Sequence, residues 1–203
     1  MPGATLAILA GAAIGALVPL ALTRVAIASW TLRDIERQLG EAKRQGWTKH
    51  FADAGDEFGF SSATLLSIAS RETNMKNIIG DGGRYGIMQI DARSYPDFIK
   101  SGDWVDPRKN IFKAAEVLDE KFRWIYENIE KKLTCGEGAK KVSFKGATLT
   151  QYGILRTTIA SYNNGCWPYY AISTYGDPDK YTSGGDYSND VINRREAFTR
   201  LLT

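Results

Sequence analysis

Residues 61–91 read SSATLLSIASRETNMKNIIGDGGRYGIMQID, and this stretch decides the fold. Its first part carries apolar residues such as Leu65 and Ala69 on one helical face, behind a serine that can cap the helix. Residues 80–83 (Gly-Asp-Gly-Gly) must form a turn, because clustered glycines interrupt regular structure. Residues 84–91 then alternate from side to side as in a strand. The stretch therefore predicts a helix followed by a short β-hairpin.

The rest of the chain extends the helical pattern on both sides. The clearest start is Asp106-Pro107, because a capping residue stands before a proline at the first helical position. Caps and apolar stripes predict further helices over residues 31–42, 47–58, 107–129, 150–162 and 188–202. Residues 174–186 are rich in Gly, Asp, Tyr and Ser and indicate a surface loop that could border a cleft. With no internal repeat or linker, residues 29–203 are expected to form one mainly helical domain of the α+β type.

Composition and charge exclude several classes of protein. The chain has 203 residues, of which 43% are hydrophobic and 24% charged, as in an ordinary folded protein. Disordered, collagen-like and polytopic membrane proteins have different compositions. The net charge of +3 is too small and too dispersed for a nucleic-acid surface, so no nucleic-acid partner is expected. It favours an anionic partner such as a cell wall only modestly, and a mixed, solvated surface explains it equally well.

The N-terminal segment differs from the rest, because residues 1–23 contain no charged side chain. Residues 3–23 are long enough to cross or contact a membrane as an apolar helix. We interpret residues 1–28 as a signal anchor; a cleaved signal peptide, ending near Ala-Ile-Ala at 26–28, and a buried core helix are the alternatives. Lys and Arg occur only after residue 23, beginning with Arg24. Under the positive-inside rule, this distribution of positive charge would keep the domain in the cytoplasm.

Glu72 is the most informative residue for chemistry. It lies on the apolar face of the predicted helix, near its C-terminal end. Burial and the negative end of the helix dipole both favour the protonated carboxyl and raise its pKa. A general acid at neutral pH needs such a raised pKa. The alternative is a structural ion pair between Glu72 and Arg71 or Arg84.

Two further carboxylates follow Glu72 closely in the chain. Asp81 lies in the glycine turn and Asp91 ends the alternating segment, so the hairpin could bring both to the cleft that holds Glu72. One protonated acid facing ionised carboxylates is the arrangement used for glycoside hydrolysis.

Five short motifs in this order resemble the goose-type lysozyme family. The resemblance extends over about residues 48–203. The motifs are Ser-Arg-Glu-Thr at 70–73, Gly-Asp at 80–81, Tyr-Gly-Ile-Met-Gln-Ile-Asp at 85–91, Ala-Ser-Tyr-Asn-Asn-Gly at 160–165 and Asp-Tyr-Ser-Asn-Asp-Val at 186–191. It implies a lysozyme-like helical fold with a small sheet lining the cleft, and a peptidoglycan N-acetylmuramidase that needs no metal or cofactor.

The resemblance also implies roles for individual residues. Glu72 is implied as the general acid, and Asp81 and Asp91 as the groups that position a water for attack with inversion. Such a mechanism expects carboxyl groups about 6.5–9.5 Å apart. The residues implied to line the sugar sites are Tyr85, Met88, Gln89, Tyr162 and Asn163, although Met88 could instead pack in the core.

Two other functions stay open. A lytic transglycosylase uses a single Glu and needs no carboxylate to position water, so Asp81 and Asp91 argue against it. A non-catalytic glycan-binding or membrane-tethered domain would not need three acids. An enzyme of this kind is expected to be exported, either membrane-anchored or secreted, with cytoplasmic retention before release as the alternative.

The two cysteines, Cys135 and Cys166, allow two interpretations. Joined, they would close a loop of about 30 residues and stabilise the fold by roughly 3–4 kcal/mol, as an exported protein permits. Two free thiols are the alternative. A cysteine nucleophile is not expected, because the only histidine is the distant His50. No metal-ligand spacing is present, so no metal site is predicted.

Overall fold

The computed structural model describes residues 30–203. The predicted signal anchor at residues 1–28, with its membrane contact through residues 3–23, lies outside the described residues. None of the helices in residues 30–203 is both long enough and apolar enough to cross a membrane. The elements, with η for a 3-10 helix, are α1 (Leu32–Arg44), α2 (Trp47–Phe58), α3 (Ser62–Thr73), β1 (Ile79–Gly80), β2 (Arg84–Tyr85), β3 (Ile90–Asp91), α4 (Pro96–Lys100), η1 (Asp103–Val105), α5 (Pro107–Glu127), β4 (Lys132–Cys135), η2 (Gly138–Lys140), β5 (Val142–Lys145), α6 (Gln151–Asn164), α7 (Trp167–Tyr175), η3 (Pro178–Tyr181), η4 (Ser183–Gly185) and α8 (Tyr187–Leu202).

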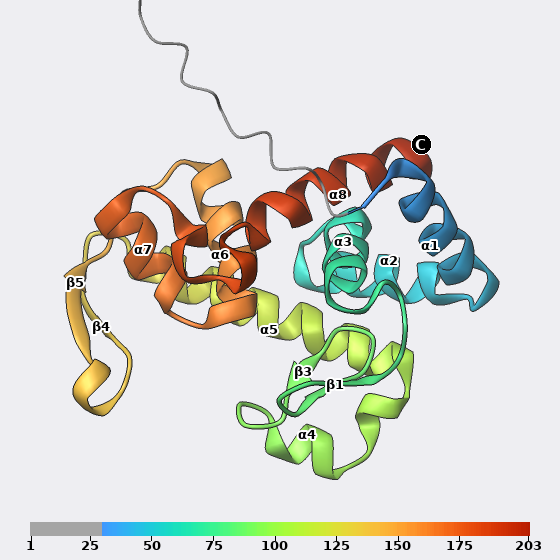
Figure 1. The fold of residues 1–203 in the computed structure, drawn as a ribbon, viewed down its shortest axis with the longest axis horizontal. Helices are drawn as coiled ribbons and strands as arrows, with labels where there is room; N and C mark the ends of the chain where they lie inside the picture. The colour runs from blue at the N-terminus through green and yellow to red at the C-terminus, as the bar shows by residue number, and fades with distance from the viewer. Residues whose placement is uncertain (1–29) are drawn as a thin grey trace, which may run out of the picture.

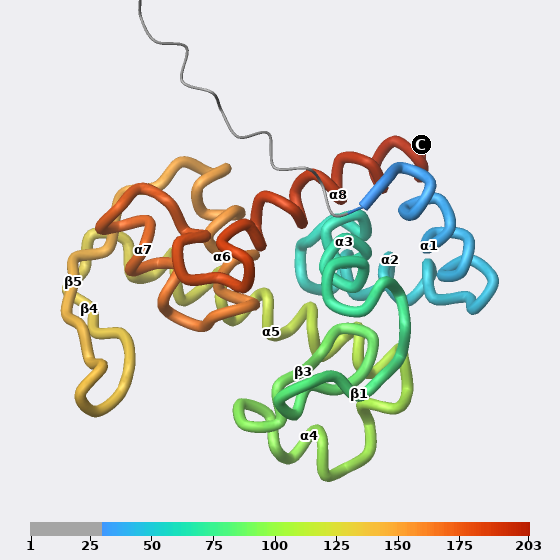
Figure 2. Tube along the Cα trace, viewed as in Figure 1, coloured from blue at the N-terminus to red at the C-terminus, as the bar shows by residue number. Residues whose placement is uncertain are grey.

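The long helix α5 runs through the middle of the molecule (Figure 1). Helices α1, α2 and α3 lie toward one end of it, and α6, α7 and the β4–β5 hairpin toward the other. Helix α8 runs from the α6 end to the α1 end and so connects the two groups. The chain leaves α3 directly into the small β1–β2–β3 sheet, which lies with α4 below α5 (Figure 2). The predicted mainly helical fold with a small sheet is confirmed.

The hydrophobic core forms where α3 packs against α8 and α2, with α5 packed on α2. Leu65 and Ile68 of α3, Ile111 of α5, and Val191 and Phe198 of α8 are all fully buried. Each such side chain contributes roughly 1.5–3 kcal/mol by leaving water. This packing on two helices fixes the orientation of the last turn of α3.

The predicted helix starts are confirmed by their caps. The Ser61 hydroxyl accepts a hydrogen bond from the Thr64 amide (3.2 Å) at the start of α3. The Asp106 carboxylate accepts from the Arg108 amide (2.8 Å) at the start of α5, with Pro107 in the first helical position. These side chains satisfy amide groups that have no partner within the helix.

The predicted short hairpin after α3 is present, but residues 84–91 do not alternate as one strand. The structure has two separate two-residue strands, β2 and β3, with a turn between them. Gly86 and Gln89 adopt positive φ angles of 83° and 53°, which an extended strand cannot contain. The three strands form an antiparallel sheet in the order β1–β2–β3, with Arg84 paired to Asp91.

Two regions contain structure that the sequence did not predict. The connection after α5 forms the antiparallel β4–β5 hairpin, and α7 follows α6. Both pack on a second small core of Ile125, Ile154 and Tyr169. The predicted surface loop at residues 174–186 contains the end of α7 and the short helices η3 and η4, and its Asp179 is fully buried.

Candidate active site

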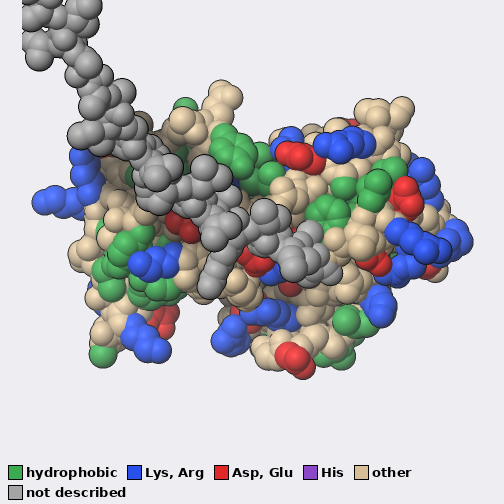
Figure 3. Space-filling model, turned by 45° about the horizontal axis from the view of Figure 1, so that its top comes forward, with side chains coloured by type: hydrophobic (Ala, Val, Ile, Leu, Met, Phe, Trp, Pro, Cys, Tyr) green, Lys and Arg blue, Asp and Glu red, His purple; other side chains and the backbone are tan. Residues whose placement is uncertain are grey.

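A cleft of about 890 Å³ separates the small sheet from the β4–β5 hairpin. Arg84 and Asp91 line it from the sheet, Gly136 from the hairpin, and Tyr162 from α6. Glu72 reaches it from the last turn of α3. Figure 3 shows the surface hollowed at its lower edge, between the part of the molecule with the hairpin and the part with the sheet. The cleft is open to solvent and is lined mostly by polar and charged side chains.

Glu72 is partly buried where α3 ends. The helix stops at Asn74, whose φ of 53° turns the chain away into the sheet. Burial raises the pKa of the Glu72 carboxyl, which outweighs the lowering by its hydrogen bond with Tyr187 and by the nearby charges of Arg84 and Arg71. The direction of the shift agrees with the prediction, and burial favours the protonated carboxyl.

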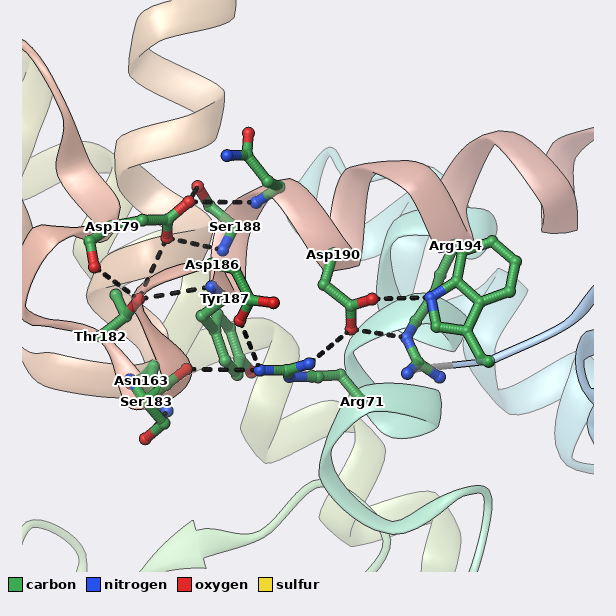
Figure 4. Close-up of polar contacts among 12 residues, drawn as sticks. Arg71, Asn163, Asp179, Thr182, Ser183, Asp186, Tyr187, Ser188, Asp190 and Arg194 are labelled. Atoms are coloured by element: carbon green, nitrogen blue, oxygen red, sulfur yellow. Dashed lines mark hydrogen bonds and ion pairs between the residues drawn. The ribbon is translucent and has the colours of Figure 1, made fainter. Parts of the chain in front are cut away.

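Tyr187 is the residue beside Glu72 that sequence reasoning missed. Its hydroxyl donates a hydrogen bond to Glu72 Oε1, and its ring is buried at the start of α8. The start of α8 is held by Asp179, whose carboxylate accepts from the Ser188 amide (2.8 Å) and the Asn189 amide (3.2 Å) (Figure 4). A carboxylate at a helix N-terminus is favourable because it faces the positive end of the helix dipole. Asp179 thereby positions Tyr187.

Arg71 is engaged away from Glu72. Its guanidinium pairs with Asp190 (2.8 Å) and Asp186 (2.9 Å) of the α8 region, and lies over the Tyr187 ring (Figure 4). Asp190 also pairs with Arg194 at 2.8 Å. This network fixes α8 against α3, and Arg71 contributes only the smallest of the effects on the Glu72 pKa. An Arg71–Glu72 ion pair is therefore not what holds the carboxyl.

Asp91 lines the cleft from β3, and its surroundings favour the ionised carboxylate. Arg93 donates to its carboxylate from the backbone amide (2.9 Å) and from Nη2 (2.7 Å). These bonds, with the charges of Arg93 and Arg84, lower the pKa of Asp91. The cleft thus contains a carboxyl with a raised pKa, Glu72, and a carboxylate with a lowered one. Arg84 lines the cleft and acts electrostatically on both.

The other two sheet residues predicted for the site lie elsewhere. Asp81 is exposed in the turn between β1 and β2, and the lining of the cleft does not include it. Tyr85 is also outside the lining and packs edge-on against Trp104, with ring centroids 5.0 Å apart. The structure therefore brings Asp91, but not Asp81 or Tyr85, to the cleft with Glu72.

Met88 and Gln89 lie in the turn between β2 and β3 rather than on a strand. The Met88 side chain is fully buried, so it packs in the core, and its carbonyl accepts from the Tyr162 hydroxyl (2.7 Å). Gln89 lines the cleft, and its amide donates to the carbonyls of Gly86 (2.8 Å) and Ile78 (3.2 Å).

Tyr162 and Asn163 both line the cleft from the end of α6. Burial raises the pKa of Tyr162 well above its ordinary value, so its hydroxyl stays a hydrogen-bond donor. The Asn163 Oδ1 accepts from the Ser183 amide (2.9 Å), which connects α6 to η4. Asn163 therefore shapes the cleft wall as well as facing it.

Asn110 is a second residue that the sequence did not point to. It is fully buried on α5, accepts from the Met88 amide (2.8 Å) and donates to the Tyr85 carbonyl (3.1 Å). A Cβ added to Gly86 would lie 2.2 Å from the Asn110 amide, so only glycine fits there. Asn110 thus holds the turn that carries Gln89 toward the cleft.

Cys135 and Cys166 form a disulfide with a Cα–Cα distance of 5.7 Å. The bond joins the end of β4 to the α6–α7 junction, and Cys166 itself lines the cleft. The free-thiol alternative is thereby set aside. Within residues 30–203, no group of three or more His, Cys, Asp and Glu side chains is placed to hold a metal ion.

No family model matches the chain. Among known proteins, it is 30% identical to lysozyme g of Takifugu rubripes over 152 residues, which covers 71% of this chain and 69% of the relative. It is 29% identical to lysozyme g of Epinephelus coioides over 154 residues, with 70% and 69% covered. It is 25% identical to lysozyme g of Cyprinus carpio over 178 residues, with 83% of each chain covered.

Proposed function

This chain belongs to the lysozyme g family and is a glycoside hydrolase of the lysozyme type, and we propose that Glu72 is its general acid. The observation that carries the proposal is the pairing in one cleft of a carboxyl with a raised pKa and a carboxylate with a lowered one. Environments that separate two pKa values in this way assign acid and base roles. The substrate is the β-1,4 bond between N-acetylmuramic acid and N-acetylglucosamine of peptidoglycan.

In the reaction, the protonated Glu72 gives its proton to the glycosidic oxygen, and the bond to the anomeric carbon breaks. Asp91 takes a proton from a water that attacks the opposite face of that carbon, so the configuration is inverted. Arg84, which interacts with both groups, stabilises the Glu72 carboxylate left after proton transfer. Tyr187 donates to the same carboxylate. Gln89, Tyr162 and Asn163 contact the sugars.

Asp81 has the secondary role in this proposal, because it lies in an exposed turn outside the cleft lining. Asp91 therefore carries the role of positioning the water in this proposal, and the predicted contribution of Asp81 stays a prediction. The enzyme works outside the cytoplasm, where the Cys135–Cys166 disulfide is stable. That residues 1–28 anchor the domain to a membrane stays a prediction.

The test compares Glu72→Gln with Glu57→Gln, which changes an exposed glutamate on α2. Glu72→Gln should lower the rate of peptidoglycan hydrolysis by about 10²–10⁴-fold, the usual contribution of a general acid. Glu57→Gln should leave the rate unchanged. A fully active Glu72→Gln enzyme would refute the assignment.

Asp91→Asn and mass spectrometry of the products test the role of water. The proposed hydrolysis predicts reducing ends and a large loss of rate in Asp91→Asn. Mainly 1,6-anhydromuramic products, with Asp91→Asn still active, would instead show a transglycosylase, in which no water attacks.

A further inference from the structure

Four aromatic side chains form a continuous cluster beside the cleft, on α7 and η3. We call Trp167, Tyr170, Tyr175 and Tyr181 the aromatic cluster. Trp167 contacts Tyr170 and Tyr181 edge-on, with ring centroids 5.8 and 5.9 Å apart. Tyr170 stacks on Tyr181 at 6.1 Å and meets Tyr175 edge-on at 5.9 Å. These are the distances and angles of favourable ring pairs.

The outer members of the cluster are open to solvent. Tyr175 is 47% exposed and Tyr181 is 40% exposed. Their hydroxyls lie 3.5 Å apart, and the Tyr170 hydroxyl lies 3.4 Å from that of Tyr175. The Lys180 ammonium lies 3.3 Å from the Tyr175 ring centroid. The patch therefore offers aromatic rings, several hydroxyls and one positive charge together.

The cluster is continuous with the cleft. Trp167 lines the cleft directly and contacts Tyr181. Asn164 also lines it, and its amide donates a hydrogen bond to the Tyr181 carbonyl. A polymer that leaves the cleft past Trp167 would therefore meet Tyr181 next.

We propose that the aromatic cluster is an extended binding site for the glycan strand, beyond the sugars held in the cleft. A sugar ring has an apolar face and a hydroxyl rim, which match exposed tyrosine rings with their phenolic hydroxyls. Rigid tyrosines supply this contact area at low entropic cost, because they have only two side-chain torsions. The strand's path through the cleft rests on the proposed function, whereas binding at the cluster can be measured without catalysis.

The first experiment measures binding to insoluble peptidoglycan in the inactive Glu72→Gln background. Replacing both exposed rings, Tyr175→Ala with Tyr181→Ala, should weaken binding by about tenfold. Tyr152→Ala is the control, since Tyr152 is a tyrosine outside the cluster, at the start of α6, and at 58% is more exposed than either exposed ring of the cluster. Circular dichroism checks that each variant is folded. Unchanged binding by the folded double variant would overturn the proposal.

The second experiment measures hydrolysis by the otherwise unaltered enzyme. The same double variant should lose kcat/KM on polymeric peptidoglycan but keep the rate on short soluble oligosaccharides that fit within the cleft. An equal loss on both substrates would indicate damage to the cleft and overturn the proposal. If instead Glu72→Gln stayed active, the catalytic assignment would fail while the binding result at the cluster still stood.

Discussion

Removing the Cys135–Cys166 bond should destabilise the protein through its unfolded state. The bond spans 31 positions of sequence. In the chain-entropy model, a loop of that length costs the unfolded chain about 12 cal/mol/K, or about 3.7 kcal/mol at 25 °C. For a domain of this size, that free energy lowers Tm by about 7–15 °C. We therefore expect the double variant Cys135→Ser, Cys166→Ser to unfold at clearly lower denaturant concentration and temperature.

Removing the disulfide should also change the cleft, because Cys166 and Gly136, which follows Cys135, both line it. Without the bond, the β4–β5 hairpin keeps its contacts with α7 but loses its covalent tie to α6. We expect a raised KM for polymeric substrate at a temperature where the variant is still folded.

Urea unfolding with and without reductant measures the effect. Reductant should destabilise the wild-type protein by about the same 3.7 kcal/mol. It should leave the stability of the double serine variant unchanged, so that variant is the control for other effects of the reductant. A difference below 1 kcal/mol between oxidised and reduced wild type would refute the reasoning.

Three further predictions concern the supports of the site. Tyr187→Phe removes a donor that favours ionised Glu72, so the pKa of Glu72 should rise further and activity should persist to higher pH, as a pH–rate profile would show; an alkaline limit moved downward contradicts this. Asn110→Ala leaves the Met88 amide and the Tyr85 carbonyl without their hydrogen-bond partner, and should lower the free energy of unfolding in urea by about 2–4 kcal/mol. A loss under 1 kcal/mol would show that the turn is stable without Asn110. Asp190→Ala breaks the buried ion pair with Arg194 and the partly buried pair with Arg71, and should cost about 3–5 kcal/mol by thermal unfolding; an unchanged Tm would show that the protein does not need these ion pairs for its stability.

The helices were predictable because their signals are local. Ser61 and Asp106 cap α3 and α5, and the apolar residues that follow recur at the helical period. Glu72 could be singled out for the same reason, since its helical face is readable from its near neighbours. The direction of its pKa shift could be predicted from that apolar face and from its position near the C-terminal end of the helix.

The short strands and the β4–β5 hairpin were not predictable in the same way. Residues 84–91 alternate like a strand, but their path is set by Asn110, which lies on another element and bonds to the turn. A two-residue strand has too few side chains to show a period. Which of Asp81 and Asp91 would reach the cleft depended on this turn as well.

The sequence by itself determined the helical class and indicated the family, and it predicted a candidate acid at the end of α3, because each of these rests on short local patterns in the chain. Only the tertiary structure decided which groups surround that acid. Tyr187 lies 115 positions from Glu72, and Asp179 positions it from a segment that reads as an ordinary polar loop. Such pairs leave no local pattern, because their contact depends on how α8 packs across α3. The chemistry of Glu72 is therefore set by burial and partners that exist only once the chain is folded.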